Sequence, residues 1–241
     1  MTMTRLVTVT LMGRSVVVTA MLAIGCVRAD APPDTDPAAA IEPGSAARAI
    51  LLDPTRSAWS DIAPDTFLAV FETSRGGFTI EVVRAWAPIG ADRFYNLIRH
   101  GYDDDVRFHR VVPGFITQWG VAGDPEVTAV WYDRGMADDP VVASNDRGTI
   151  AYAFTEPGTR STQVYISMVD NTRLDAQGFA PFGRVVEGME SVVDSIYSGY
   201  GEESGGGVRA GDQAPLVEEG NAYLDREFPR LDRLIRARVV R

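Results

Sequence analysis

The sequence predicts a mainly β fold, an antiparallel barrel or sandwich, on three observations. Two short β-prone runs, residues 67–71 and 78–83, flank the glycine-containing segment 72–77, which is a hairpin signal. Residues 106–186 form short apolar stretches separated by Gly, Pro, Asn and Asp, as is typical of antiparallel sheets. Finally, apolar residues and arginines alternate over residues 234–239, and this period of two indicates a strand. We expect that strand to return along an edge and close a barrel.

Two longer helices are predicted between these strands. After Pro88, apolar residues recur at helical spacing over 91–98, and His100-Gly101 suits a last helical turn followed by a left-handed terminator. Apolar residues at i, i+3, i+4 and i+7 over 189–196 predict the second helix, which would end at Gly199.

The remaining segments are predicted to be linkers, loops or short helices. Residues 26–64 are rich in Ala, Pro, Asp and Ser and are expected to be mostly a linker, with a short helix within 46–59. The folded domain is expected over 65–241, with an insertion at about 199–230 that begins with a glycine-rich exposed loop. Another short helix is expected over 221–228, stopped by Pro229.

Composition excludes several classes of function. All 23 basic residues are arginines, so Schiff-base chemistry and a phosphate-binding P-loop lysine are excluded. The formal net charge of the chain is −10. Residues 1–25 hold two arginines and no acid, so the chain without them has 21 arginines and 33 acids and a net charge of −12. Such a surface repels phosphate backbones, so no nucleic-acid partner is expected. The short run of arginines at 233–241 is the only candidate for a basic face that could bind one.

The first 26 residues resemble a bacterial export signal. An arginine-bearing start precedes an uncharged stretch, 15–25, that is too short to span a bilayer as a helix. Residues 22–26, Leu-Ala-Ile-Gly-Cys, resemble a lipobox, so 1–25 are expected to be removed and Cys26 acylated. The alternative is an ordinary secretory signal cut after Ala20. Either reading places the protein outside the cytoplasm, with a lipid anchor at Cys26 as its only expected membrane contact.

A conventional acid/base, nucleophilic or metal site is not expected. The chain has two histidines, His100 and His109, no GxSxG-type nucleophile turn and one cysteine, so neither an internal disulfide nor a CxxC pair can form. The acidic clusters 103–105, 138–139 and 202–203 lack the spacing of a calcium loop and are expected to be solvated turns. No cofactor or metal is therefore expected.

One block stands out: residues 108–120, FHRVVPGFITQWG. It resembles the signature of the cyclophilin peptidyl-prolyl cis-trans isomerases, and supporting similarity continues through 148–153, 161–166 and 174–189 in family order. The resemblance covers roughly residues 65–200. It implies a closed eight-stranded antiparallel β-barrel capped by two α-helices, an isomerase without a cofactor, and proline-containing polypeptides as substrates. A monomer is expected.

The resemblance also assigns residues. Arg110 matches the family's catalytic arginine, and Phe115 and Gln118 complete the catalytic set. A guanidinium can stabilise the pyramidal proline nitrogen of the twisted amide, a reaction that needs neither a proton acceptor nor a nucleophile. The substrate-binding set is expected to comprise the apolar slot and its rim: Ile116, Ala153, Tyr165, Arg173, Leu174 and Phe179.

Three of these residues depart from the family pattern. Arg173 stands where cyclosporin-sensitive eukaryotic members carry tryptophan, Tyr165 replaces a phenylalanine, and Phe179 occupies the place of an active-site histidine. These changes leave a second hypothesis open, a peptide-binding or chaperone module that keeps the barrel without useful turnover. The retained arginine, phenylalanine and glutamine favour the enzyme.

Overall fold

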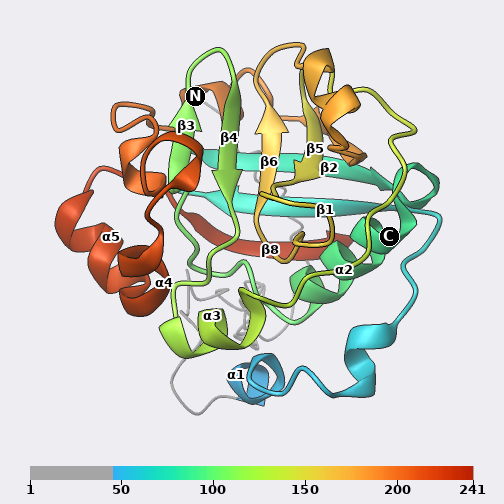
Figure 1. Ribbon diagram of the computed structural model, residues 1–241, viewed down its shortest axis with the longest axis horizontal. Helices are drawn as coiled ribbons and strands as arrows, with labels where there is room; N and C mark the ends of the chain where they lie inside the picture. Colours follow the sequence, from blue (N-terminus) through green and yellow to red (C-terminus); the bar gives the residue numbers. More distant parts are fainter. Residues whose placement is uncertain (1–45, 241) are drawn as a thin grey trace, which may run out of the picture. The chain divides into compact units, whose positions relative to one another are not determined.

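The computed structural model of the chain describes residues 46–240 (Figure 1). The expected export segment 1–25, the acylation site Cys26 and the linker up to residue 45 lie outside the described residues. The described part contains one antiparallel sheet with eight strands: β1 Thr66–Thr73, β2 Gly76–Val83, β3 Arg110–Val112, β4 Ile116–Trp119, β5 Thr149–Tyr152, β6 Val164–Ser167, β7 Pro181–Glu187 and β8 Leu234–Val240.

The predicted hairpin is β1–β2. Phe67, Ala69 and Phe71 of β1 are buried at every second position, as the period of two requires. Phe71 pairs with Phe78 across the hairpin, and their rings stack with centroids 4.7 Å apart. This aromatic pair forms part of the main core, which the curled sheet encloses.

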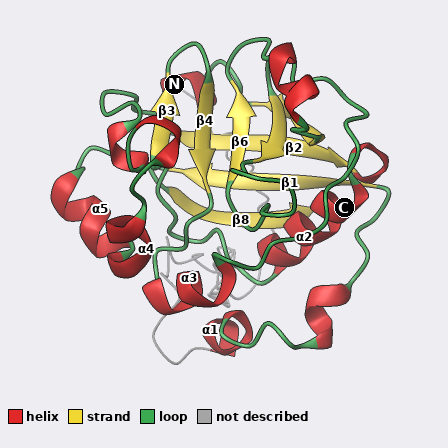
Figure 2. Ribbon diagram, viewed as in Figure 1, coloured by secondary structure: helices red, strands yellow, loops and turns green. Residues whose placement is uncertain are grey.

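The sheet is an open half-barrel, which corrects the expectation of a closed barrel. Its strand order is β3-β4-β6-β5-β7-β2-β1-β8, and Figure 2 shows β3, β4 and β6 crossing in front of β1, β2 and β8. The chain just before β3 pairs with the beginning of β8 around an isolated bridge between Arg107 and Arg233, with backbone hydrogen bonds from Phe108 to Asp232 and from Leu234 to Val106. Beyond it, at the residue before β3, the His109 carbonyl accepts a hydrogen bond from the Ser204 hydroxyl at 2.7 Å and so pairs with the insertion. The last strand therefore returns along β1 but does not close the barrel.

The first predicted helix is present as α2, Pro88–Arg99, with His100 as its C-cap and Gly101 at φ +73°. Its first turn receives a partner from a distant loop. Asp139, 7 % exposed, accepts hydrogen bonds from the backbone N–H groups of Ile89 and Gly90 at 3.0 and 2.8 Å. Asp139 therefore stabilises the start of α2. This corrects the expectation that residues 138–139 form a solvated turn.

The second predicted helix, over 189–196, is not formed, although its apolar residues are buried as predicted. Met189 and Ile196 are buried, and the two valines between them lie in the same core. The only helical residues there form a 3₁₀ turn, Val193–Ser195. Backbone hydrogen bonds in this segment alternate between i−3, i−4 and i−5 partners, so no α-helical ladder develops.

Four further α-helices lie outside the sheet in the described part: α1 Ala46–Leu51, α3 Pro125–Trp131, α4 Ala214–Glu219 and α5 Asn221–Glu227. The first and last of these match the short helices predicted at 46–59 and 221–228. Leu51 of α1 is 1 % exposed, and its carbonyl accepts the Trp131 indole N–H at 2.7 Å. The segment from residue 46 to 63 thus packs on the domain, although the linker was expected to reach residue 64. None of the described helices is long and apolar enough to cross a membrane.

The C-terminal arginines are used within the domain. Arg233, Arg236 and Arg238 form ion pairs with Asp105, Glu72 and Asp104. The described part of this run therefore does not present an unpaired basic strip to a nucleic acid.

Asp103 is buried, in contrast to the solvated turn expected at 103–105. It is 4 % exposed, and its one hydrogen bond comes from the Trp119 indole at 3.4 Å. Burial raises the pKa of the Asp103 carboxyl to about 7.

Replacing Asp103 with Asn is expected to stabilise the protein at high pH. Because the native pKa lies above the unfolded value, the carboxyl does not destabilise the fold below pH 4. Its destabilising effect grows as the pH rises through 7, to a free energy on the order of a few kcal/mol. Asp103→Asn should therefore raise the denaturant midpoint at pH 8 and leave it nearly unchanged at pH 4. Equal midpoint differences at both pH values would contradict this assignment.

Candidate active site

The β3–β4 hairpin presents the signature residues on one face. Arg110 pairs directly with Gln118 across the hairpin, so both side chains leave the sheet on the same side. Gly114 in the connecting turn has φ +71°, a backbone conformation that favours glycine. This turn places Phe115 immediately before β4, which begins at Ile116.

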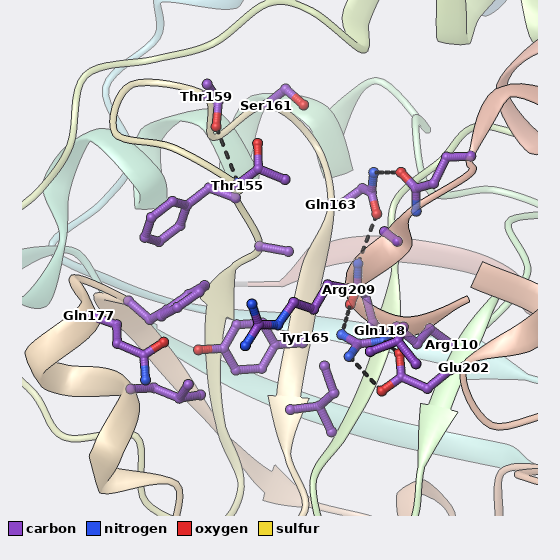
Figure 3. Close-up of a pocket in the computed structure, with 18 of the residues that line it drawn as sticks. Arg110, Gln118, Thr155, Thr159, Ser161, Gln163, Tyr165, Gln177, Glu202 and Arg209 are labelled. Carbon is purple, nitrogen blue, oxygen red and sulfur yellow. Dashed lines mark hydrogen bonds and ion pairs between the residues drawn. The ribbon is translucent and has the colours of Figure 1, made fainter. Parts of the chain in front are cut away.

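These residues line a cleft of about 960 Å³, drawn in part in Figure 3. All nine residues that the sequence nominated for catalysis or substrate binding lie on it. They are Arg110, Phe115, Ile116, Gln118, Ala153, Tyr165, Arg173, Leu174 and Phe179.

One wall of the cleft is apolar. Ile116, Tyr165 and Leu174 are buried in a single cluster, and Phe115, Ala153 and Phe179 pack on it while partly exposed. The phenol replacing the family's phenylalanine points away from water, because Tyr165 donates to Asn145 Oδ1 at 2.7 Å. Burial raises its pKa, so it stays a neutral donor. This wall offers a slot for an apolar ring.

Because Arg110, Gln118 and Tyr165 are register neighbours across β3, β4 and β6, a polar wall beside this apolar one carries the guanidinium of Arg110. Its Nε and Nη2 donate to Glu202 Oε2 and Oε1 at 2.7 and 2.9 Å, and Nη1 donates to Gln118 Oε1 at 2.9 Å. The Arg110 side chain is 12 % exposed and that of Glu202 is 28 % exposed. Since an arginine has five N–H donors, two remain for a ligand in the cleft.

A second set of hydrogen bonds holds Gln118. Its amide donates to Gln163 Oε1 at 2.8 Å, and Gln163 in turn donates to Gln213 Oε1 at 3.0 Å. Figure 3 shows this line of side chains continuing from Gln163 through Gln118 to Arg110 and Glu202. The backbone N–H of Ala153 is also used, donating to the Gln163 carbonyl at 2.9 Å. Polar groups along this wall are therefore fixed before a ligand arrives.

The nearby histidine cannot act as a base. His109 is fully buried, and desolvation lowers its pKa to about 4, so the ring is neutral at physiological pH. Its Nε2 lies 3.2 Å from Gln163 Oε1, which agrees with the packing or hydrogen-bonding role expected from the sequence. Among residues 46–240 no cluster of three or more His, Cys, Asp and Glu side chains is arranged to hold a metal ion.

Arg173 and Phe179 lie at the rim. The guanidinium carbon of Arg173 lies 4.8 Å from the centroid of the Phe115 ring, a cation–π contact that extends the apolar wall with a charged plane. Phe179 packs against Phe154 and Tyr165, with ring centroids 4.2 and 5.8 Å away. Arg173 forms no ion pair with an acid among the described residues, and its Nη1 donates to Asn171 Oδ1 at 3.3 Å.

Sequence reasoning missed the contribution of the insertion. Glu202 was expected in a solvated turn and residues 199–211 in an exposed loop, whereas Ser204 and Gly205 are buried against β3. A methyl group on Gly205 would approach Arg110 Cβ to 2.9 Å, so only glycine permits this contact. The signal in the sequence that could have indicated an acidic partner for Arg110 was the composition, in which every basic residue is an arginine, since partly buried arginines need acidic partners.

Comparisons with known proteins agree with this geometry. Residues 68–215 match the sequence profile of the family described as cyclophilin type peptidyl-prolyl cis-trans isomerase/CLD. Over 129 residues the chain is 33 % identical to peptidyl-prolyl cis-trans isomerase-like 1 of Aspergillus fumigatus, covering 51 % of this chain and 78 % of the relative. Over 140 residues it is 31 % identical to a peptidyl-prolyl cis-trans isomerase of Acinetobacter baylyi, covering 52 % and 69 %.

A solved structure supports the fold. A crystal structure of a cyclophilin type peptidyl-prolyl cis-trans isomerase of Cryptosporidium parvum superimposes with a TM-score of 0.52 and 18 % sequence identity. The superposition covers 73 % of this chain and 98 % of the parasite protein.

Proposed function

Because this chain belongs to the cyclophilin-type peptidyl-prolyl cis-trans isomerase family, we propose that it catalyses rotation about X-Pro bonds by the action of Arg110 on the proline nitrogen. Rotation breaks amide resonance, with a barrier of about 18–20 kcal/mol. In the twisted amide the proline nitrogen becomes pyramidal and gains a lone pair. A fixed cationic donor beside that atom stabilises the transition state more than either ground state.

One observation carries the proposal: a guanidinium with two unused donors lies on the same cleft as an apolar slot. The proline ring would occupy the slot of Ile116, Tyr165 and Leu174, whose lining Phe115 extends. The Arg110 guanidinium carbon is 5.7 Å from the centroid of the Phe115 ring. A ring held against this wall brings its nitrogen toward the arginine without any proton transfer.

The experiment is a turnover assay on the purified mature protein. A peptide with a chromogenic group after Ala-Pro is cleaved by a protease only in the trans form, so the slow cis phase reports isomerisation. We expect that phase to accelerate in proportion to protein concentration. If the rate of the slow phase does not change with protein concentration although the peptide binds, the second hypothesis is favoured, a binding or chaperone module without turnover. The altered lining of the slot and rim, Tyr165, Arg173 and Phe179, keeps this second hypothesis in view.

The place of action is also a proposal. The lipobox-like residues 22–26 support export and acylation, so the enzyme would act on X-Pro bonds of proteins folding on the periplasmic side of the envelope. There uncatalysed isomerisation takes tens of seconds or longer and limits folding.

The full chain is expected to partition with membranes through acyl chains on Cys26. Two or more chains make release from a bilayer slow. A matched Cys26→Ser variant should be recovered in the soluble periplasmic fraction with unchanged turnover. Mass spectrometry of the mature N-terminus provides the decisive measurement: cleavage after Ala20 with an unmodified thiol would contradict acylation and leave simple export.

A further inference from the structure

The segment 199–213 contributes two side chains to the polar wall of the cleft. Glu202 holds one edge of the Arg110 guanidinium, and Gln213 ends the line of amides that begins at Gln118. Gln213 also accepts from the Tyr132 hydroxyl at 2.9 Å and donates to the Gly205 carbonyl at 3.1 Å. Residues far apart in the sequence thus fix both partners of the β3–β4 pair.

The backbone around Glu202 is itself held in place. Its carbonyl accepts from the N–H groups of Gly205 and Gly207 at 3.2 and 2.9 Å. Ser204, 2 % exposed, ties the same turn to β3 through the His109 carbonyl. The carboxylate is therefore presented from a fixed turn that is anchored on the strand carrying Arg110.

The pair can affect catalysis in two opposite ways. A carboxylate reduces the net positive charge near the proline nitrogen, which would slow rotation. It also removes the rotational freedom of a long side chain, and a bidentate pair fixes the plane of a guanidinium. The second effect dominates here, because the reacting nitrogen carries no full charge and needs a correctly placed donor. Two N–H groups stay free for it after Glu202 and Gln118 are satisfied.

We propose that Glu202 is a positioning residue, which acts through Arg110 and brings this carboxylate of the insertion into the active site. This inference rests on the proposed function, since it assigns how the reacting donor is held. A segment absent from the signature block would thereby set the rate of the reaction.

The kinetic test uses the mature protein and compares Glu202→Ala with the matched variant Glu203→Ala, whose carboxylate is exposed and forms no ion pair among the described residues. We expect Glu202→Ala to lower kcat about tenfold with KM within about twofold, and Glu203→Ala to match the wild type. Glu202→Gln keeps one acceptor without the charge, so it should give an intermediate kcat. It also decides the matter if Glu202→Ala fails to fold.

A double-mutant cycle separates positioning from general stabilisation. Lysine at position 110 cannot form the bidentate pair, so in the Arg110→Lys background Glu202→Ala should change kcat by less than about twofold. An equal loss in both backgrounds would show that Glu202 acts elsewhere. An unchanged or higher kcat in Glu202→Ala and Glu202→Gln would overturn the proposal and identify an inhibitory carboxylate.

A readout independent of activity is the arginine Nε–H signal in ¹⁵N NMR. The wild type should show an Arg110 Nε–H protected from exchange with water, and Glu202→Ala should lose that protection while Glu203→Ala retains it. If the pair is present by this measurement but the wild type has no turnover, the proposed function fails by itself. If turnover is normal and the signal is unprotected in the wild type, the positioning role fails by itself.

Discussion

Arg110→Ala is expected to reduce kcat/KM for an X-Pro peptide by more than about tenfold while the protein stays folded, because the side chain stabilises a transition state rather than the core. A tenfold loss corresponds to about 1.4 kcal/mol of transition-state stabilisation, which is modest for a charge-assisted hydrogen bond in a partly buried cleft. Arg110 lies on the cleft wall and not among the residues that fill the apolar core, so its removal leaves the core packing intact.

Two controls make this result interpretable. Arg184→Ala removes another arginine that is paired to a carboxylate, Glu81, but lies outside the cleft, and it should leave kcat/KM unchanged. Arg110→Ala leaves Glu202 without its partner, so unfolding of the variant should be measured beside its activity. A folded Arg110→Ala protein that keeps more than a tenth of the wild-type kcat/KM would show that the electrostatic role is wrong.

The local part of the site could be predicted from the sequence because it depends on a single hairpin. Arg110 and Gln118 are eight residues apart, and an antiparallel turn at Gly114 places them opposite each other. The apolar slot needed the family resemblance, since Tyr165 and Leu174 come from other elements with no short-range link to the signature. Their assignment rested on matching blocks of sequence, and the cleft then brought all of them together.

The polar partners were not predictable in this way. Glu202 lies 92 residues from Arg110, and no periodicity connects them. The acidic clusters were expected to be solvated because runs of acids usually are, yet three of their members, Asp103, Asp139 and Glu202, are buried or engaged with partners. In a chain whose every basic residue is an arginine, an acid is often the second half of an ion pair.

The missing second helix has a different physical reason. The spacing of apolar residues over 189–196 reports which side chains face the core, and these residues are buried as predicted. Gly188, which precedes them, has φ +82° and a close approach to Phe78, where an added methyl group would lie 2.8 Å from Cβ. Its carbonyl accepts from both Val192 and Val193, which produces a tightly folded turn instead of a helix. Burial periodicity thus predicted the contacts and not the hydrogen-bond pattern.

Cyclosporin is expected to bind this protein about 30- to 1,000-fold more weakly than it binds cyclosporin-sensitive relatives, a loss of roughly 2–4 kcal/mol. In those relatives a tryptophan supplies a flat apolar face and one N–H donor at the position of Arg173. Here the Arg173 guanidinium is exposed and stacked 4.8 Å above the Phe115 ring. A bulky apolar ligand would have to displace water from that charge and bury it without an acidic partner. Small proline peptides should be much less affected, because they require the slot of Ile116 and Leu174 and not the rim.

The substitution Arg173→Trp tests the location of this effect. It should raise cyclosporin affinity and leave kcat/KM for a short proline peptide within about twofold, because an indole can take over the packing on Phe115 without carrying a charge. Arg173→Ala serves as the matched control: it removes the charge but offers no flat face, so it should recover only part of the affinity. The measurement is inhibition of the turnover assay at increasing cyclosporin concentration. Inhibition of the wild type at low nanomolar concentration would show that Arg173 folds away from the rim when the ligand binds. Equal affinities for the tryptophan and alanine variants would show that the charge, and not the lost aromatic face, decides the binding.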